Sequence, residues 1–198
     1  MPKSYTQTER TKIMNQLKAA AMESMLQKGI KKTTVDELVQ KVHIPKGTFY
    51  LFYESKEMLL YDAFLQTDEQ MHGLLAEQMQ QLVADFSPES LTELLVFFFQ
   101  MGFQTGILQL MLSGELEILI RKLPDEIVAA HIEKDDDFLQ VFARLFPHLT
   151  KQELAAYSAA FRGIFFTAGH QREIGECYEE ALHLLVRGLV LQMWSSFT

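Results

Sequence analysis

Residues 33–59 read TTVDELVQKVHIPKGTFYLFYESKEML, and this stretch decides the fold. Thr34 and Glu37 have the spacing of a capping box, which predicts the start of a short helix. Pro45 suits the first position of a following helix, because its fixed φ is helical and its missing N–H is not needed there. We expect that helix to end near Tyr53. Two short helices joined by a tight turn predict a helix-turn-helix unit.

Helical periodicity continues on both sides of this stretch. Apolar residues at helical spacing predict a first helix over about 8–28, with Gly29 placed as its C-terminal cap. Ser55 is placed to cap a long helix that continues to about Phe86. This long helix would link the N-terminal unit to the rest of the chain.

The remaining sequence repeats the same signals and shows no strand pattern. A further helix is predicted from Ser87-Pro88, and another over the apolar stretch 107–123 after a break at Gly102 and Gly106. A helical stretch is predicted from the acidic cluster 135–137 to Pro147, and a helix from the capping box Thr150-Glu153 to about Ala168. After a loop between Gly169 and Gly175, a last helix is predicted from Tyr178 onward. We therefore expect an all-α fold with two domains. Residues 1–54 form the helix-turn-helix domain, and residues 55–198 form a larger helical domain.

Charge is divided unevenly along the chain, which has a formal net charge of −8 at pH 7. Residues 1–53 hold nine Lys or Arg and four acidic residues, whereas the remainder holds nine basic and 22 acidic residues. A basic N-terminal quarter on an acidic body indicates that one end meets a polyanion, for which nucleic acid is the natural partner. A basic face that is merely solvated explains the charge alone equally well.

The quoted stretch closely resembles the DNA-binding signature of TetR-family repressors. The resemblance spans about residues 8–62 and is carried, in order, by Ala20, Ala21, Gly29, Thr34, Val35, Lys46, Gly47, Thr48, Phe49, Tyr50, Ser55, Lys56 and Glu57. It implies a dimer whose C-terminal domain binds a small molecule and then releases DNA. Beyond residue 62 only the length and the order of helices agree.

The predicted DNA-binding set is Thr33, Thr34, Lys46, Gly47, Thr48, Tyr50 and Lys56. Lys46 can reach a phosphate or a guanine edge, and Thr48 is short enough for close approach to bases. The resemblance makes Tyr50 the tyrosine that contacts the DNA backbone, and Lys56 would act similarly at the head of the long helix. Thr33 and Thr34 lie where the N-terminus of the second helix should meet phosphate, although Thr34 would cap that helix in any case.

Three residues depart from the family pattern. His43 stands where the family often has Gly in the turn, and His tolerates a positive φ better than most residues. Pro45 replaces a frequent Ser and removes a side-chain cap. Phe52 occupies a position where His or Tyr is common, so the resemblance does not carry over a phosphate contact at this position.

The C-terminal part is rich in Phe and Met, which can line an adaptable apolar cavity. The predicted ligand-binding residues are Phe97, Phe98, Met101, Phe103, Met111, Phe142, Phe161 and Phe165. Apolar stripes at helical spacing usually fill a core, and for any single residue of this set that interpretation is the stronger one. The resemblance favours a pocket for the set as a whole.

The last two long helices carry apolar stripes that predict a dimer interface of four helices, two from each chain. The predicted interface residues are Tyr157, Phe161, Ile164, Leu182, Leu185 and Leu189.

Several other classes of protein are excluded by what the sequence lacks. Cys177 is the only cysteine, and the histidines have no metal-site spacing, so we expect neither a disulfide nor a metal. No phosphate-binding glycine loop or nucleophile elbow is present, and we expect no cofactor and no enzymatic activity. The polar start and the short apolar run Leu94–Phe99 predict a cytoplasmic protein with no membrane partner.

The sequence thus predicts a repressor that leaves a palindromic double-stranded operator when an apolar or amphipathic effector binds. The alternative is a helical small-molecule-binding protein with a vestigial DNA-binding unit. Lys46, Thr48, Tyr50 and Lys56 separate the two, because a pure carrier has no reason to keep them on one surface.

Overall fold

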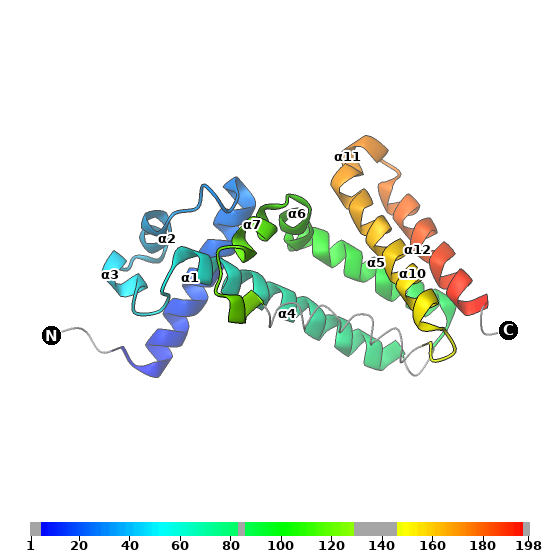
Figure 1. The fold of residues 1–198 in the computed structure, drawn as a ribbon, viewed down its shortest axis with the longest axis horizontal. Helices are drawn as coiled ribbons and strands as arrows, with labels where there is room; N and C mark the ends of the chain where they lie inside the picture. The colour runs from blue at the N-terminus through cyan, green and yellow to red at the C-terminus, as the bar shows by residue number, and fades with distance from the viewer. Residues whose placement is uncertain (1–4, 83–85, 129–145, 196–198) are drawn as a thin grey trace. The chain divides into compact units, whose positions relative to one another are not determined.

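In the computed structural model of the protein, residues 5–82, 86–128 and 146–195 are described, and they form helices joined by turns (Figure 1). The all-α prediction is confirmed. The helices are α1 (Gln7–Lys28), α2 (Val35–Val42), α3 (Lys46–Phe49), α4 (Lys56–Leu82), α5 (Pro88–Gln104), α6 (Ile107–Leu112), α7 (Glu115–Ile120), α10 (Lys151–Thr167), the 3-10 turn η2 (Ala168–His170), α11 (Gln171–Ile174) and α12 (Tyr178–Ser195).

The expected caps are present at most helix starts. Ser87 accepts a hydrogen bond from the N–H of Ser90, and Pro88 occupies the first turn of α5. Thr150 and Glu153 form the predicted capping box of α10, with the Thr150 N–H donating to the Glu153 carboxylate at 2.8 Å. The Thr150 hydroxyl donates to the same carboxylate at 2.7 Å, and this bond, followed by the bond from the N–H, holds the pKa of Glu153 below its usual value. Caps therefore set these helix starts locally.

Five local predictions are wrong. The stretch 107–123, predicted as helical throughout, is divided into α6 and α7 at Gly114, where φ is +70°. Helix α3 ends at Phe49 rather than near Tyr53, and Pro45 is its N-cap rather than its first helical residue. Gly102 does not break α5, which continues to Gln104; the break falls at Gly106, where φ is +74°. The expected loop between Gly169 and Gly175 contains η2 and α11. The predicted helix between residues 135 and 147 lies almost wholly outside the described residues.

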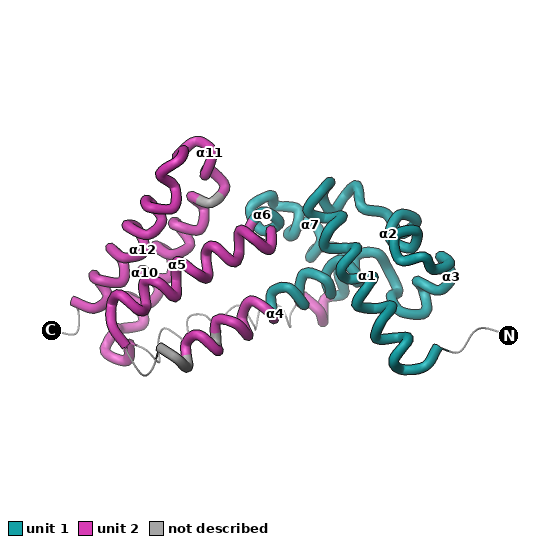
Figure 2. The backbone as a smooth tube through the Cα atoms, turned by 180° about the vertical axis from the view of Figure 1, so that it is seen from behind, with its two compact units in different colours: residues 1–69, 109–124 teal, residues 70–108, 125–198 magenta. Residues whose placement is uncertain are grey.

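Contacts divide the chain into two compact units, coloured separately in Figure 2. The first holds residues 1–69 and 109–124, and the second holds residues 70–108 and 125–198. Helix α4 thus contributes its first part to one unit and its remainder to the other. The domain boundary predicted between residues 54 and 55 stays a prediction, and the segment 109–124 joins the N-terminal unit through contacts distant in sequence.

Each unit has its own apolar interior. In the first, Leu17, Ala21, Leu38, Phe49 and Leu59 are fully buried. In the second, α5, α10 and α12 pack together around Leu91, Leu95, Phe99, Phe146, Phe161, Ile164, Leu182, Val186, Val190 and Met193. Among the described residues, no helix is both long and apolar enough to span a bilayer.

Candidate nucleic-acid interface

Helices α2 and α3 are joined by a tight turn whose geometry depends on His43. This residue has φ 59° and ψ 43°, and it is the one non-glycine residue with a positive φ in the described part of the chain. Its N–H donates to the carbonyl oxygen of Gln40, and the N–H of Ile44 donates to that of Val39. The left-handed turn expected at this position is therefore present, with His in place of Gly.

Helix α3 is too short to be stable by itself and is held by tertiary contacts. Phe49 is fully buried, and burying a Phe side chain contributes about 1.5–3 kcal/mol. With Phe49 facing inward, the side chains of Lys46 and Tyr50 are exposed on α3 and at its end, and Gly47 faces open space. These three predicted DNA-binding residues share one accessible surface of α3.

Thr48 lies differently from the prediction. Thr48 is buried, with 8% of the residue exposed, beside the fully buried Phe49. It therefore offers little surface to a base, in contrast to Lys46 and Tyr50.

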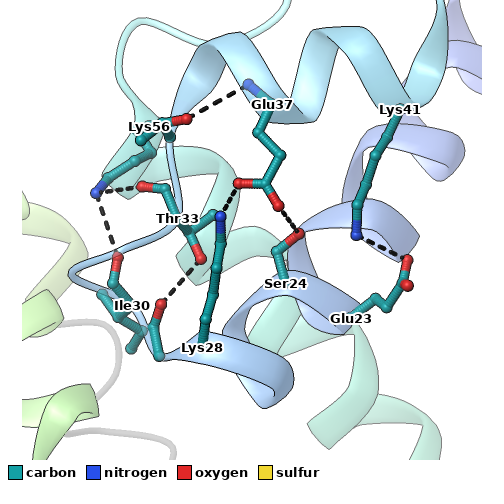
Figure 3. Close-up of polar contacts among 10 residues, drawn as sticks. Glu23, Ser24, Lys28, Ile30, Thr33, Glu37, Lys41 and Lys56 are labelled. Atoms are coloured by element: carbon teal, nitrogen blue, oxygen red, sulfur yellow. Dashed lines mark hydrogen bonds and ion pairs between the residues drawn. The ribbon is translucent and has the colours of Figure 1, made fainter.

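Thr33 and Lys56 are also turned inward, as Figure 3 shows. The hydroxyl of Thr33, a fully buried residue, donates to the carbonyl oxygen of Gly29 at 2.9 Å. The ammonium of Lys56 donates to the carbonyl oxygens of Thr33 at 2.9 Å and of Ile30 at 3.3 Å. Both side chains thus fix the turn ahead of α2 from within.

The N-terminus of α2 carries one half of the predicted capping box. The Thr34 hydroxyl accepts a hydrogen bond from the N–H of Glu37 at 3.4 Å. The Glu37 carboxylate does not return to Thr34. It accepts instead from the Lys28 ammonium and, at 3.3 Å, from the Ser24 hydroxyl, both on α1 (Figure 3). The bond from Lys28 lowers the pKa of Glu37 below its usual value, so this carboxylate links α2 to α1.

Lys46 has a partner that the sequence did not indicate. Its ammonium lies 2.9 Å from both carboxylate oxygens of Asp36, the second residue of α2. Both side chains are open to solvent, at 51% exposed for Lys46 and 72% for Asp36. The hydrogen bond from Lys46 to Asp36 raises the pKa of Lys46.

Other residues of this surface were also missed. Lys31 and Lys32 are exposed in the turn ahead of α2, where cations would meet phosphate. Their signal was present in the sequence as part of the basic N-terminal charge. Phe52 packs beneath Arg10, whose guanidinium carbon lies 4.8 Å from the ring centroid. This departure from the family pattern therefore positions another cation.

The predicted ligand-binding residues do not gather in one place. Phe161 is buried in the core of the second unit, and Phe98, Phe103 and Phe165 pack against that core. Met101 is half-buried, whereas Met111 is 45% exposed and belongs to the first unit. Phe142 lies outside the described residues.

An open groove of about 1050 Å³ lies in the second unit, and Phe97 is the member of the predicted ligand-binding set that lines it. Its lining mixes apolar and acidic side chains: Gln78 from α4; Ser90, Glu93, Leu94, Val96, Phe97 and Gln100 from α5; and Glu179, Glu180, His183 and Leu184 from α12. His183 lies 3.1 Å from the Glu93 carboxylate across this groove.

The predicted dimer stripes mainly face the core of their own chain. Phe161, Ile164 and Leu182 are buried, and Tyr157 and Leu189 are half-buried. Leu185 is 47% exposed. The opposite faces of the two helices are open and, besides the exposed charged residues Arg162, Glu180 and Arg187, include small or apolar residues, which are Ala156, Ala159, Gly163 and Phe166 on α10 and Leu184, Gly188 and Leu191 on α12. We call these seven small or apolar residues the open face.

Figure 1 shows α10 and α12 running side by side, with α11 at one end of the pair. In the parts of the chain that the structure describes, no group of three or more His, Cys, Asp or Glu side chains could hold a metal ion.

Comparison with known proteins gives one family match in sequence. Residues 17–63 match the model of the tetR family of bacterial regulatory proteins. The matched range contains α2, the turn at His43 and α3. No curated protein matches the chain in sequence.

Solved structures resemble nearly the whole chain. A proposed tetR-family transcriptional regulator from Mesorhizobium loti has a TM-score of 0.68 at 17% identity, covering 96% of this chain and 98% of its own. A tetR-like transcriptional regulator from Rhodococcus has a TM-score of 0.63 at 20% identity, covering 97% and 99%. A proposed fatty acid metabolism regulator from Clostridium perfringens has a TM-score of 0.62 at 16% identity, covering 90% and 97%. These likenesses extend the agreement from the N-terminal unit to the fold of the chain.

Proposed function

We propose that the chain is a cytoplasmic transcriptional repressor that binds a palindromic operator as a homodimer. Residues 17–63 match the tetR-family model, and solved structures of similar fold are named as transcriptional regulators, which supports this proposal. A small apolar or amphipathic effector releases it from the operator. The observation that carries this proposal is the surface of α2 and α3, where Lys46, Gly47 and Tyr50 are exposed beside the N-terminus of α2. Two of the similar solved structures are named as transcriptional regulators, which supports a regulator rather than an enzyme.

Phosphate contacts position such a unit on DNA, and base contacts give it specificity. Tyr50, 53% exposed, can donate its hydroxyl to a phosphate, and Lys31 and Lys32 add charge ahead of α2. Lys46 can donate to guanine. Thr33, Thr34 and Lys56 support the contact by shaping the turn and the N-terminus of α2, whose N–H groups favour phosphate.

The homodimer rests on the open face. Phe166 and Leu184 are 62% and 69% exposed, and large apolar side chains grouped on one surface favour a partner. Gly163 and Gly188 leave space for close packing of helices, since an added Cβ would meet nothing within 4 Å. A second copy of the chain offers the same pair of helices, and a twofold dimer would form a four-helix interface.

The effector is proposed to act on α4, because this one helix contributes to both compact units. A ligand that shifts the second unit can alter the first through α4 and so change the spacing of the two α3 helices in the dimer. Half-sites lie about one helical turn apart, so a small change in spacing removes contacts. The groove at Phe97 supports an amphipathic ligand, and the Clostridium structure is named for fatty acid metabolism.

The proposal is tested by selecting duplexes from a random pool with the wild-type protein. We expect a palindrome, bound less tightly as salt rises, with a log-log salt slope that falls by about one for each lost phosphate contact. Amphipathic compounds that stabilise the protein are then titrated against the bound duplex. Release of DNA supports the switch, whereas stabilising ligands with no sequence-selective DNA binding would establish the alternative of a small-molecule-binding protein with a vestigial DNA unit.

A further inference from the structure

Asp36 places a negative charge on a surface that is proposed to meet a polyanion. It lies on the surface where α2 and α3 are proposed to meet DNA, and it is 72% exposed. A carboxylate repels phosphate, so its presence opposes general affinity for DNA. The dipole of α2 favours an acid in its first turn, whereas the exposed ion pair with Lys46 adds little to folding stability.

The pair joins the two helices of the motif at their starts. Asp36 belongs to the first turn of α2, and Lys46 is the first residue of α3. The Lys46 ammonium is shared by both Asp36 oxygens, at 2.9 Å from each. A hydrogen-bond donor and an acceptor are therefore held next to each other on the accessible surface.

Building on the proposed function, we propose that Asp36 is a specificity-determining residue that reads, together with Lys46, one G·C base pair in each half-site. In the major groove guanine presents the acceptors N7 and O6, and the paired cytosine presents the N4 amino donor. Lys46 would donate to guanine, and Asp36 would accept from cytosine N4.

The spacing of the pair fits this edge. Guanine O6 and cytosine N4 are hydrogen-bonded to each other, and such bonds are about 2.9 Å long. The Lys46 ammonium and the Asp36 oxygens are also 2.9 Å apart. A thymine·adenine pair offers a similar acceptor, thymine O4, and a similar donor, adenine N6. Thymine, however, gives Lys46 one acceptor where guanine gives two, and its methyl group lies beside that acceptor. Partial neutralisation of Lys46 by Asp36 also weakens its attraction to phosphate on any sequence.

The test compares duplexes selected by wild type, Asp36→Ala and Asp36→Asn. Wild type should enrich one G·C pair per half-site, and Asp36→Ala should lower the preference for it roughly tenfold. Asp36→Asn should move the preference toward adenine, because an amide pairs with adenine N6 and N7. The matched control is Glu23→Gln, which removes an equally exposed class of carboxylate, 3.1 Å from Lys41 and on α1. The control should keep the wild-type preference.

A second measurement uses the wild-type operator with 7-deazaguanine at the selected position. Loss of N7 should weaken wild type several-fold and leave Lys46→Ala unchanged. The inference is overturned if Asp36→Ala keeps the G·C preference, or if Asp36→Ala and Glu23→Gln raise affinity alike on every sequence. In those cases wild type still selects an operator, so the proposed function is retained and only the role of Asp36 is rejected. If wild type selects no sequence at all, the proposed function fails and the inference fails with it.

Discussion

The carboxylate of Glu115 accepts a hydrogen bond from the main-chain N–H of Ile30, 85 positions earlier in the chain. Ile30 lies in the turn between α1 and α2, and Glu115 is the first residue of α7. The carbonyl oxygen of the same Ile30 accepts from Lys56. Both main-chain groups of Ile30 therefore depend on charged side chains, one from α7 and one from α4.

Replacing Glu115 by Ala should destabilise the first unit by about 1–3 kcal/mol, because it leaves the N–H of buried Ile30 without an acceptor. Glu117→Ala is the matched control, since Glu117 lies on the same helix and is exposed. Chemical denaturation measures both. Equal unfolding free energies of Glu115→Ala and Glu117→Ala would show that the Glu115 contact does not stabilise the unit.

Gly29→Ala should be strongly destabilising for two reasons. Gly29 has a φ of +85°, which Ala adopts with strain, and an added Cβ would lie 2.6 Å from both Glu115 carboxylate oxygens. Combining Gly29→Ala with Glu115→Ala should recover part of the loss, as a double-mutant cycle would measure. Gly73→Ala, in the middle of α4 with nothing within 4 Å, should instead be neutral or stabilising. If the changes in unfolding free energy of Gly29→Ala and Glu115→Ala simply add in the double variant, the steric contact is not present.

Lys56→Met should lower stability by about 1–3 kcal/mol, because two carbonyl oxygens of the 29–33 turn lose their donor. DNA affinity should fall on all sequences alike, since the turn positions the whole of α2. Lys122→Met, which removes a 55% exposed lysine of the same unit, is the control. A salt slope reduced by about one with unchanged stability would instead show a direct phosphate contact by Lys56.

The Glu37 carboxylate should make stability depend on pH under acidic conditions. Its pKa in the folded state lies below the ordinary value of 4.5, mainly because Lys28 donates a hydrogen bond to it. The contribution is therefore complete above about pH 4.5 and is lost as the pH falls through the lowered pKa. Denaturation of wild type and Glu37→Gln between pH 7 and 3 should show a difference in unfolding free energy that shrinks toward low pH. A constant difference would contradict this assignment.

Leu184→Glu should convert the proposed dimer to a monomer without loss of helicity, because it places a charge on the open face, where Leu184 is 69% exposed at the edge of the groove. The control is Ile174→Glu, which changes a 43% exposed apolar residue on α11, outside the open face. Light scattering gives the mass, and circular dichroism gives the helicity. If Leu184→Glu keeps the mass of a dimer, the open face is not the dimer interface.

Signals read over a few neighbouring residues were sufficient for most of the helices. Thr34, Ser55, Ser87 and Thr150 each accept the capping hydrogen bond that their position predicts, since a cap involves only the next three residues. His43 likewise takes the left-handed conformation that the turn requires. The helix-turn-helix unit and its family resemblance were readable for the same reason.

The direction of each side chain was decided by tertiary packing. Thr48 and Lys56 belong to the motif, yet the burial of Phe49 and the carbonyl groups of the 29–33 turn direct them inward. The stripe of Phe161 and Leu182 was visible in the sequence, but periodicity cannot tell whether an apolar face meets its own core or a second chain.

The sequence by itself determined most of the helices, most of their caps and the helix-turn-helix motif, because these depend on residues close together along the chain. Only the tertiary structure decided that Glu115 holds Ile30, that Asp36 holds Lys46, and that α4 is shared between two units. Such pairings arise when separate helices pack, and no local spacing encodes which charged side chain will reach which group across that contact.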